Sequence, residues 1–238
     1  MRFIDLKKQY ELHRVNIQKR ILKVLEHGQY IMGPEVFELE EKLAEYVGIK
    51  NCISCSSGTD GLLICLMAWD IGPNDAVFTT PFTFIATAEV IRLTGATPVF
   101  VDIDRDTLNI DPESLENALQ NIIKNGTLNP KAVIPVNLFG LLADYEKLEP
   151  ICDKYNLNLL EDAAQSFGAS FNGKKSCSFG DAAATSFFPA KPLGCYGDGG
   201  AVFTDNDSLA DKMKSIRIHG KSADKYDNVR IGLNGRMD

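Results

Sequence analysis

From about residue 50 onward, short apolar runs alternate with longer helical stretches along the chain. Successive strands joined through helices pair in parallel, because each helical crossover returns the chain to the same end of the sheet. The alternation therefore predicts an α/β fold with a mostly parallel central sheet sandwiched by helices. The expected strands are residues 52–55, 76–80, 98–103, 132–139, 157–162, 182–188 and 200–204.

Helices are expected between these runs and ahead of them. Residues 5–26 carry apolar side chains at helical spacing, and Pro34 is placed to open a second helix that runs to about Val47. Further helices are expected between the first strand and Trp69, after the second strand through Leu93, around 144–155 and over 207–219. We interpret the 238 residues as one large domain with an N-terminal helical segment at 1–48.

Composition excludes several classes of function. The net charge of −7 argues against a nucleic-acid surface or an anionic membrane surface, and no apolar run has the length of a membrane span. The charged N-terminus does not resemble a signal peptide, and the six irregularly spaced cysteines suit a reducing, cytoplasmic setting.

Cys52 and Cys55 form a CxxC, which we expect on one face of a buried strand. No metal site is predicted, because no second ligand pair accompanies it and the chain has three histidines.

Small and polar residues follow several of the expected strands. Ligands of such sheets collect at the carboxyl ends of the strands, so these groups are expected to converge on one crevice. They are Ser56, Ser57, Gly58, Thr59 and Asp60 after the first strand, Glu161, Asp162 and Gln165 after 157–160, and Ser186 and Lys191 after 182–185.

The segment SSGTDGLL places hydroxyls and Gly58 where a strand passes into a helix. The N–H groups and the dipole at a helix start favour a phosphate. A plain helix cap is the alternative, and taken alone it is the favoured interpretation, since serine and threonine are common there. Neither a Walker P-loop nor a GxGxxG fingerprint is present.

Asp162 stands at the end of an apolar strand, where a half-buried carboxylate needs a cationic partner. The protonated ring nitrogen of pyridoxal phosphate is one such partner. The alternative is a cap for a following helix.

Lys191 lies between Pro189 and Pro192 in the stretch FFPAKPLGCYGDGG. An apolar, glycine-rich setting partly desolvates the amine and so favours its uncharged, nucleophilic form, which a Schiff base requires. The alternative is a solvated turn lysine, but the glycines let the backbone approach a bulky planar group closely. Phe84 could stack on a flat ring or belong to the core. Together these features specify one cofactor, pyridoxal 5'-phosphate.

With these residues in view, the chain resembles the sugar aminotransferases of the DegT/DnrJ/EryC1/StrS family, which are fold-type I pyridoxal-phosphate enzymes. The resemblance covers nearly the whole chain and is carried by FIDLKKQY, GQYIMGPEV, CISCSSGTDGL, PFTFIATAE, PVFVDID, EDAAQSFGAS, TSFFPAKPLGCYGDGGA and NGRMD. Within the family it is most similar to the 3-transaminases of UDP-linked 2-acetamido-3-keto uronic acids, mainly through HGQYIMGPEV, CISC and KPLGCYGDGG.

The resemblance implies a role for each matching residue. Lys191 would hold the cofactor and transfer the proton, and Asp162 would pair with the ring nitrogen. Gln165 would lie near the ring hydroxyl, and Phe84 would stack on the ring. The implied phosphate ligands are Gly58, Thr59, Ser186 and, from a neighbouring subunit, Asn234. The implied substrate contacts are Gly28 and Tyr30 with the nucleotide-sugar, and Arg236 with the sugar carboxylate across the interface of a homodimer, where a planar guanidinium suits a carboxylate.

The implied reaction is a ping-pong transamination. An amino donor, L-glutamate, would leave as 2-oxoglutarate, and its nitrogen would pass to the keto carbon of the sugar. The product would be an amino sugar for a surface polysaccharide such as O-antigen.

Three features depart from the family pattern. The chain stops at Asp238 within NGRMD, so we expect a C-terminal small domain to be missing or not shown, with incomplete substrate binding and an exposed face. Ala190 stands where relatives carry serine, and Gly235 where they carry a larger residue. Open alternatives are a non-catalytic or truncated family member and a C-4 keto-sugar aminotransferase. A sugar 3-dehydratase is disfavoured because Lys191 is present, and a nucleotide-cofactor oxidoreductase because its glycine fingerprint is missing.

Overall fold

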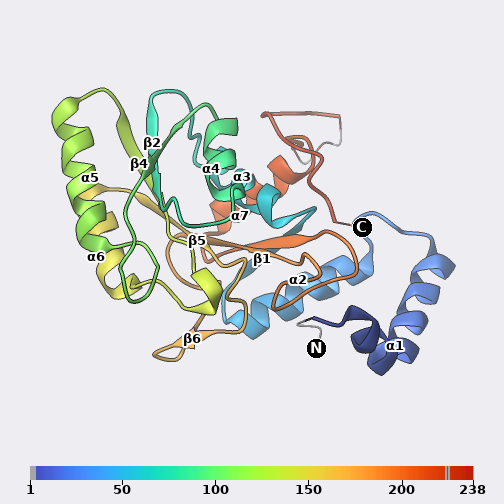
Figure 1. The fold of residues 1–238 in the computed structure, drawn as a ribbon. Helices are drawn as coiled ribbons and strands as arrows, with labels where there is room; N and C mark the ends of the chain where they lie inside the picture. The colour runs from blue at the N-terminus through green and yellow to red at the C-terminus, as the bar shows by residue number, and fades with distance from the viewer. Residues whose placement is uncertain (1–3, 223, 225, 238) are drawn as a thin grey trace.

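The core of the molecule is one twisted sheet with helices on both faces (Figure 1). The computed structural model describes residues 4–222, 224 and 226–237, and within them the sheet has seven strands in the order β1-β9-β8-β5-β4-β2-β3. These strands are β1 (Asn51–Cys55), β2 (Asp75–Thr79), β3 (Thr97–Phe100), β4 (Asn129–Ile134), β5 (Asn158–Asp162), β8 (Ala182–Ser186) and β9 (Gly200–Thr204). A separate two-residue ladder joins β6 (Ser170–Phe171) to β7 (Lys174–Lys175).

The strand directions confirm the predicted mostly parallel sheet. β3, β2, β4, β5 and β8 pair in parallel, and β9 runs antiparallel to both β8 and β1. β8 and β9 are adjacent and joined by the turn that contains Lys191, as the sequence predicts.

The predicted helices are also present, with shifts of a few residues at their ends. They are α1 (Leu6–His27), α2 (Pro34–Val47), α3 (Gly58–Ala68), α4 (Ala86–Leu93), α6 (Tyr145–Tyr155) and α7 (Asp207–Arg217). The predicted strands 98–103 and 132–139 are too long, because β3 ends at Phe100 and β4 at Ile134, and Leu138–Gly140 forms a short 3-10 turn.

One helix of the structure is not among those expected from the sequence. α5 (Pro112–Asn125) begins with an Asp111 side chain that accepts from the Ser114 N–H, and it ends at Gly126 in the left-handed conformation. An Asp-Pro pair at the start and a glycine after the end are strong helix signals, so the sequence contains the information that predicts this helix.

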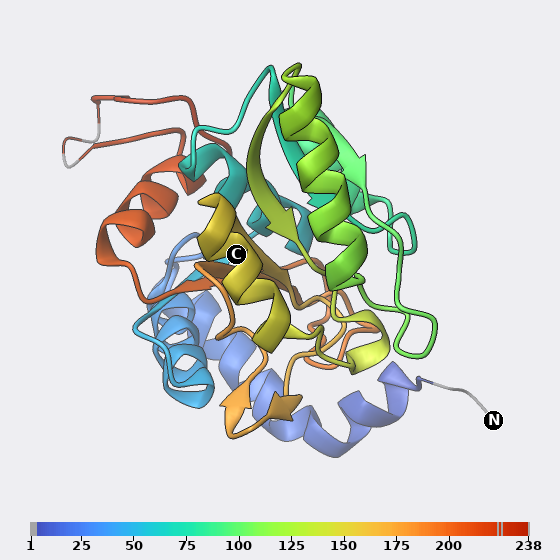
Figure 2. The same cartoon turned by 90° about the vertical axis from the view of Figure 1, so that its left-hand side faces the viewer.

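Alternation along the strands assigns each helix to a face of the sheet. Val77 and Leu160 pack on the side of α3 and α4, and their neighbours Phe78 and Leu159 pack on the side of α5 and α6. In Figure 2, α5 and α6 lie in front of the sheet. On the same side as α5 and α6, α2 covers the β1–β9–β8 end through residues such as Leu43.

The expectation for Cys52 and Cys55 was wrong. Residues three apart in a strand point to opposite faces, and Cys52 packs in the cluster beside α2 while Cys55 packs beside α3. Both are buried free thiols, and burial raises the pKa of Cys55 to about 12.

α1 lies at one side of the body of the molecule and contributes no buried residue (Figure 1). Its apolar side chains, including Leu12, Val15 and Leu25, are exposed. No helix among the described residues combines the length and the apolar character needed to cross a membrane.

Candidate active site

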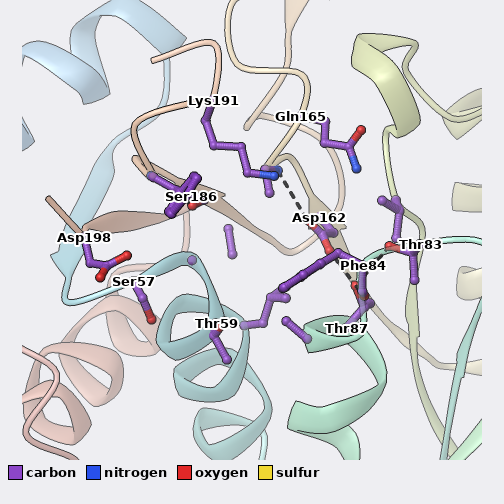
Figure 3. Close-up of a pocket in the computed structure, with 17 residues that line it drawn as sticks. Ser57, Thr59, Thr83, Phe84, Thr87, Asp162, Gln165, Ser186, Lys191 and Asp198 are labelled. Atoms are coloured by element: carbon purple, nitrogen blue, oxygen red, sulfur yellow. Dashed lines mark hydrogen bonds between the residues drawn. The ribbon is translucent and has the colours of Figure 1, made fainter. Parts of the chain in front are cut away.

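A pocket of about 400 Å³ lies at the carboxyl ends of β5 and β8, where it faces the starts of α3 and α4 (Figure 3). The strand ends contribute Asp162 and Ser186, and the helix starts contribute Gly58 and Phe84. The turn between β8 and β9 contributes Lys191, so five segments far apart in the sequence meet at one place.

The structure brings most of the predicted site residues together around this pocket. Its lining includes Gly58, Thr59, Phe84, Asp162, Gln165, Ser186 and Lys191. It does not include Gly28, Tyr30, Asn234 or Arg236.

Asp162 is the buried acid of the site, with 5% of its surface exposed. Its Oδ2 accepts from the Thr87 hydroxyl at 2.9 Å, and its Oδ1 accepts from the Ala164 N–H at 3.2 Å. Burial raises the pKa of the Asp162 carboxyl, and these two hydrogen bonds and the charge of Lys191 act in the opposite direction. Residues 164–168 form a turn and no helix follows Asp162 there, so the alternative of a helix cap is wrong.

The start of α3 is held close against the end of β8. Ser57 caps the helix by accepting from the Asp60 N–H at 3.1 Å, so the capping interpretation is confirmed for this residue. A Cβ at Gly58 would lie 2.6 Å from Ser186 Cβ, and a Cβ at Gly200 would lie 2.7 Å from Gly58 N. Glycine at both positions is therefore required for this close packing, which places the start of α3 beside Ser186 at the pocket. The first N–H groups of a helix have no intrahelical backbone partner.

The turn that carries Lys191 is fixed by its backbone. The Lys191 N–H donates to the Phe188 carbonyl at 2.8 Å, and the Cys195 N–H donates to the Phe187 carbonyl at 2.7 Å. A Cβ at Gly194 would lie 2.4 Å from the Pro189 carbonyl oxygen, so the tight turn depends on that glycine. The Lys191 side chain extends from this turn across the pocket in the direction of Asp162 (Figure 3).

Phe84 and Gln165 stand at the rim. Phe84 is 67% exposed and lines the pocket, so the core interpretation of this side chain is wrong. The Gln165 Oε1 accepts from the Phe139 N–H at 2.9 Å, which leaves the amide –NH₂ as a donor for another group.

Asn234 and Arg236 lie together outside the pocket. The Asn234 Oδ1 accepts from Arg236 Nε at 3.0 Å and from Nη2 at 2.6 Å. The intervening Gly235 is held by its backbone, which donates to the Arg217 carbonyl and accepts from the Ser56 N–H, both at 3.0 Å.

Gly28 and Tyr30 lie in the loop after α1. Gly28 ends that helix with a φ of 71°, and Tyr30 is exposed. Ala190 is exposed and is not among the residues that line the pocket.

Three further polar residues of the lining were given no role from the sequence. They are Thr83, Thr87 and Asp198. Thr83 and Thr87 lie in the PFTFIATAE segment, four residues apart around the start of a helix, a spacing that places two side chains on one face.

The sequence model described as the DegT/DnrJ/EryC1/StrS aminotransferase family matches residues 12–238. This chain belongs to that family. The chain accordingly has the fold of its structural neighbours, which are pyridoxal-phosphate aminotransferases of fold type I.

Three similar proteins illustrate the match. The UDP-2-acetamido-2-deoxy-3-oxo-D-glucuronate aminotransferase of Pseudomonas aeruginosa is 52% identical over 99% of this chain and 64% of its own length. The crystal structure of a DegT DnrJ EryC1 StrS aminotransferase from Brucella abortus is 52% identical, with a TM-score of 0.99 over 100% of this chain and 64% of that one. The structure of NtdA from Bacillus subtilis with bound cofactor PMP is 32% identical, with a TM-score of 0.86 over 94% of this chain and 50% of that one. The present chain thus spans less than two thirds of the length of these relatives.

Proposed function

We propose that this protein transfers an amino group to a nucleotide-linked keto-sugar with pyridoxal 5'-phosphate as its cofactor. The observation that carries the proposal is the convergence of a lysine amine, a buried carboxylate and an open helix start on one pocket. These are the three groups that a pyridine ring with an aldehyde and a phosphate needs.

The residues present fit that cofactor. The N–H groups of Gly58 and Thr59 and the hydroxyls of Thr59 and Ser186 would hold the phosphate, since the closeness of Gly58 to Ser186 leaves the helix start uncovered. The Asp162 carboxylate would hold the protonated ring nitrogen, and Phe84 would cover a face of the ring. The –NH₂ of Gln165 would donate to the ring hydroxyl.

The bound cofactor supplies an electron sink for the carbon that gains or loses a proton. Lys191 Nζ would hold the cofactor covalently between turnovers, and as a free amine it would move that proton. The turn fixed by the Lys191 and Cys195 N–H groups would position this amine for the proton transfer.

The substrate that we propose is a UDP-linked 2-acetamido-3-keto uronic acid, with L-glutamate as the amino donor. The 52% identity to the Pseudomonas aeruginosa aminotransferase, which extends over nearly this whole chain, supports it. The product would serve a surface polysaccharide such as O-antigen, and the reaction would take place in the cytoplasm.

A second copy of the chain would complete the site as a homodimer. Asn234 from the partner copy would reach the phosphate, and Arg236 the sugar carboxylate, while Gly28 and Tyr30 would contact the nucleotide-sugar. The position of Asn234 and Arg236 outside their own pocket and the exposed apolar side chains of α1 support this arrangement.

The experiment is a single half-reaction followed by absorbance. The protein loaded with pyridoxal phosphate is mixed with UDP-linked 3-amino and 4-amino sugars, and conversion of the cofactor to its amine form is recorded. Conversion with the 3-amino uronate alone is expected. Conversion with a 4-amino sugar instead would favour a C-4 keto-sugar aminotransferase, and no conversion with any of them would favour a non-catalytic family member.

A further inference from the structure

Thr87 makes a contact with Asp162 that the sequence did not predict. Its side chain is 1% exposed, in the first turn of α4, and its Oγ1 lies 2.9 Å from Asp162 Oδ2. The two residues are 75 positions apart in the chain. Figure 3 shows both beside Phe84 and Thr83 at one side of the pocket.

The direction of this hydrogen bond follows from the chemistry of the groups. An ionised carboxylate can only accept, so the one hydroxyl proton of Thr87 points at Asp162. The Phe84 carbonyl is a second acceptor near the same hydroxyl, but it is neutral and lies at 3.4 Å. A charged acceptor at 2.9 Å forms the stronger bond, so the Thr87 proton goes to Asp162.

That assignment also fixes the proton of Thr83. The Oγ1 atoms of Thr83 and Thr87 lie 3.3 Å apart, and this distance alone does not decide which hydroxyl is the donor. Because the Thr87 proton is already used, Thr83 donates to Thr87. The result is a directed chain from Thr83 through Thr87 to Asp162, and Phe84 lies on the turn that the two threonines bracket.

The start of α4 has no side-chain cap, since Ile85 occupies that position. The threonine chain therefore links the Phe84 turn to the end of β5. The same link leaves Asp162 with unused acceptor capacity, because the carboxylate has about four lone-pair sites and accepts two hydrogen bonds.

We propose that Thr87 is a positioning residue, whose hydroxyl orients Asp162 toward the ring nitrogen of the cofactor and, with Thr83, ties the Phe84 turn to that carboxylate. The inference rests on the proposed function, because it assigns a task to a group behind the same site. Thr87 acts through Asp162 and need not touch the cofactor.

Thr87→Val removes the hydroxyl at nearly constant volume, and Thr87→Ser retains it. A buried threonine of the sheet, Thr79, provides the matched control, because its Oγ1 donates to the Ile134 carbonyl at 2.9 Å and it does not line the pocket. Thr79→Val therefore reports the cost of losing a buried hydroxyl without touching Asp162.

Two readouts are taken on each variant. The first is the dissociation constant of pyridoxal phosphate by fluorescence titration. The second is the pKa of the Asp162 carboxyl in the cofactor-free protein, from carbon NMR with Asp162→Asn to assign the signal.

Thr87→Val is expected to weaken cofactor binding about tenfold and to raise the Asp162 pKa by about one unit, the effect of one hydrogen bond to a charged group. Thr87→Ser is expected to match the parent in both readouts. Thr79→Val is expected to lower the unfolding temperature and leave both readouts at parental values. Thr83→Val, at a partly exposed position, is expected to weaken cofactor binding about threefold. This variant tests the threonine chain if Thr87→Val does not fold.

The two proposals fail differently. A parent protein that does not bind pyridoxal phosphate overturns the proposed function and this inference with it. A parent that binds, together with Thr87→Val and Thr83→Val variants of equal affinity and unchanged Asp162 pKa, overturns the inference alone.

Discussion

The two faces of β5 carry adjacent carboxylates with different surroundings. Glu161 is fully buried on the face away from the pocket, and Asp162 is turned toward the pocket with 5% of its surface exposed. Glu161 accepts four hydrogen bonds, from Asn137 Nδ2, the Ser176 hydroxyl, the Cys177 N–H and the Phe179 N–H, at 2.7, 2.8, 2.9 and 3.1 Å. Asp162 accepts two.

The difference separates a structural acid from the acid that we propose binds the cofactor. Glu161 accepts three of its four hydrogen bonds at Oε1 and one at Oε2, and these bonds tie residues 176–179 and Asn137 to the sheet. Asp162 keeps acceptor capacity on the side of the cavity and faces the positive charge of Lys191. Spare acceptor capacity at a buried carboxylate, rather than burial itself, thus marks the binding group.

The largest effect is expected from Asp162→Asn. The asparagine amide carries no negative charge to pair with a protonated ring nitrogen. Removing one partner of a buried ion pair costs about 3–5 kcal/mol, so pyridoxal phosphate is expected to bind roughly 10²- to 10³-fold more weakly. A fluorescence titration measures this. The cofactor-free variant is expected to unfold at or above the parental temperature, because a buried charge is removed. Parental affinity in this variant would remove the distinction between the two acids.

Glu161→Gln is expected to change stability and its pH dependence instead. Burial raises the pKa of Glu161 from 4.5 to about 7, against four hydrogen bonds that lower it. Because the folded pKa lies above the unfolded value, the stability from this group is fully present below pH 4.5 and is lost as the pH rises through 7. The shift corresponds to roughly 3 kcal/mol.

Urea unfolding between pH 4 and 8 measures that loss. The parent is expected to lose stability across this window, and Glu161→Gln, which does not titrate, is expected to show a flatter profile and lower stability at pH 4.5, because its –NH₂ opposes the Phe179 N–H. Its cofactor affinity is expected to stay near the parental value. A variant with the parental pH profile would show that Glu161 does not titrate there.

A smaller effect is expected from Gly58→Ala. The new methyl would lie 2.6 Å from Ser186 Cβ, and the strain of forcing the two segments apart is about 1–3 kcal/mol. Gly197→Ala is the matched control in the Lys191 turn, since nothing lies within 4 Å of its Cβ position. Gly58→Ala is expected to bind inorganic phosphate and pyridoxal phosphate more weakly, and Gly197→Ala is expected to bind them as the parent does. Equal binding by the two variants would exclude the start of α3 as the phosphate-binding site.

Much of this comparison was open to prediction from the sequence. Asp162 and Lys191 could be found because strand ends and the proline-glycine turn are local patterns, and parallel strands bring their carboxyl ends together. Glu161 and Asp162 were grouped alike at the end of the strand, because adjacency in sequence does not tell which acid meets donors from residues 137 and 176–179.

The remaining site features depend on contacts distant in sequence. The Thr87 hydroxyl meets a carboxylate 75 residues away, and no local pattern signals that pair. The close approach of Gly58 to Ser186 likewise arises only when α3 packs against β8. By contrast, the two errors at Cys52 and α5 were local, since strand periodicity and helix capping signals already determine both.

The proposed function depends above all on a covalent bond between Lys191 Nζ and pyridoxal phosphate beside Asp162. This bond can be detected by borohydride reduction of the loaded protein, followed by proteolysis and mass spectrometry. We expect one pyridoxyl group on the peptide that contains Lys191, and none in Lys191→Ala. Attachment to another lysine, or none after incubation with excess cofactor, would contradict it.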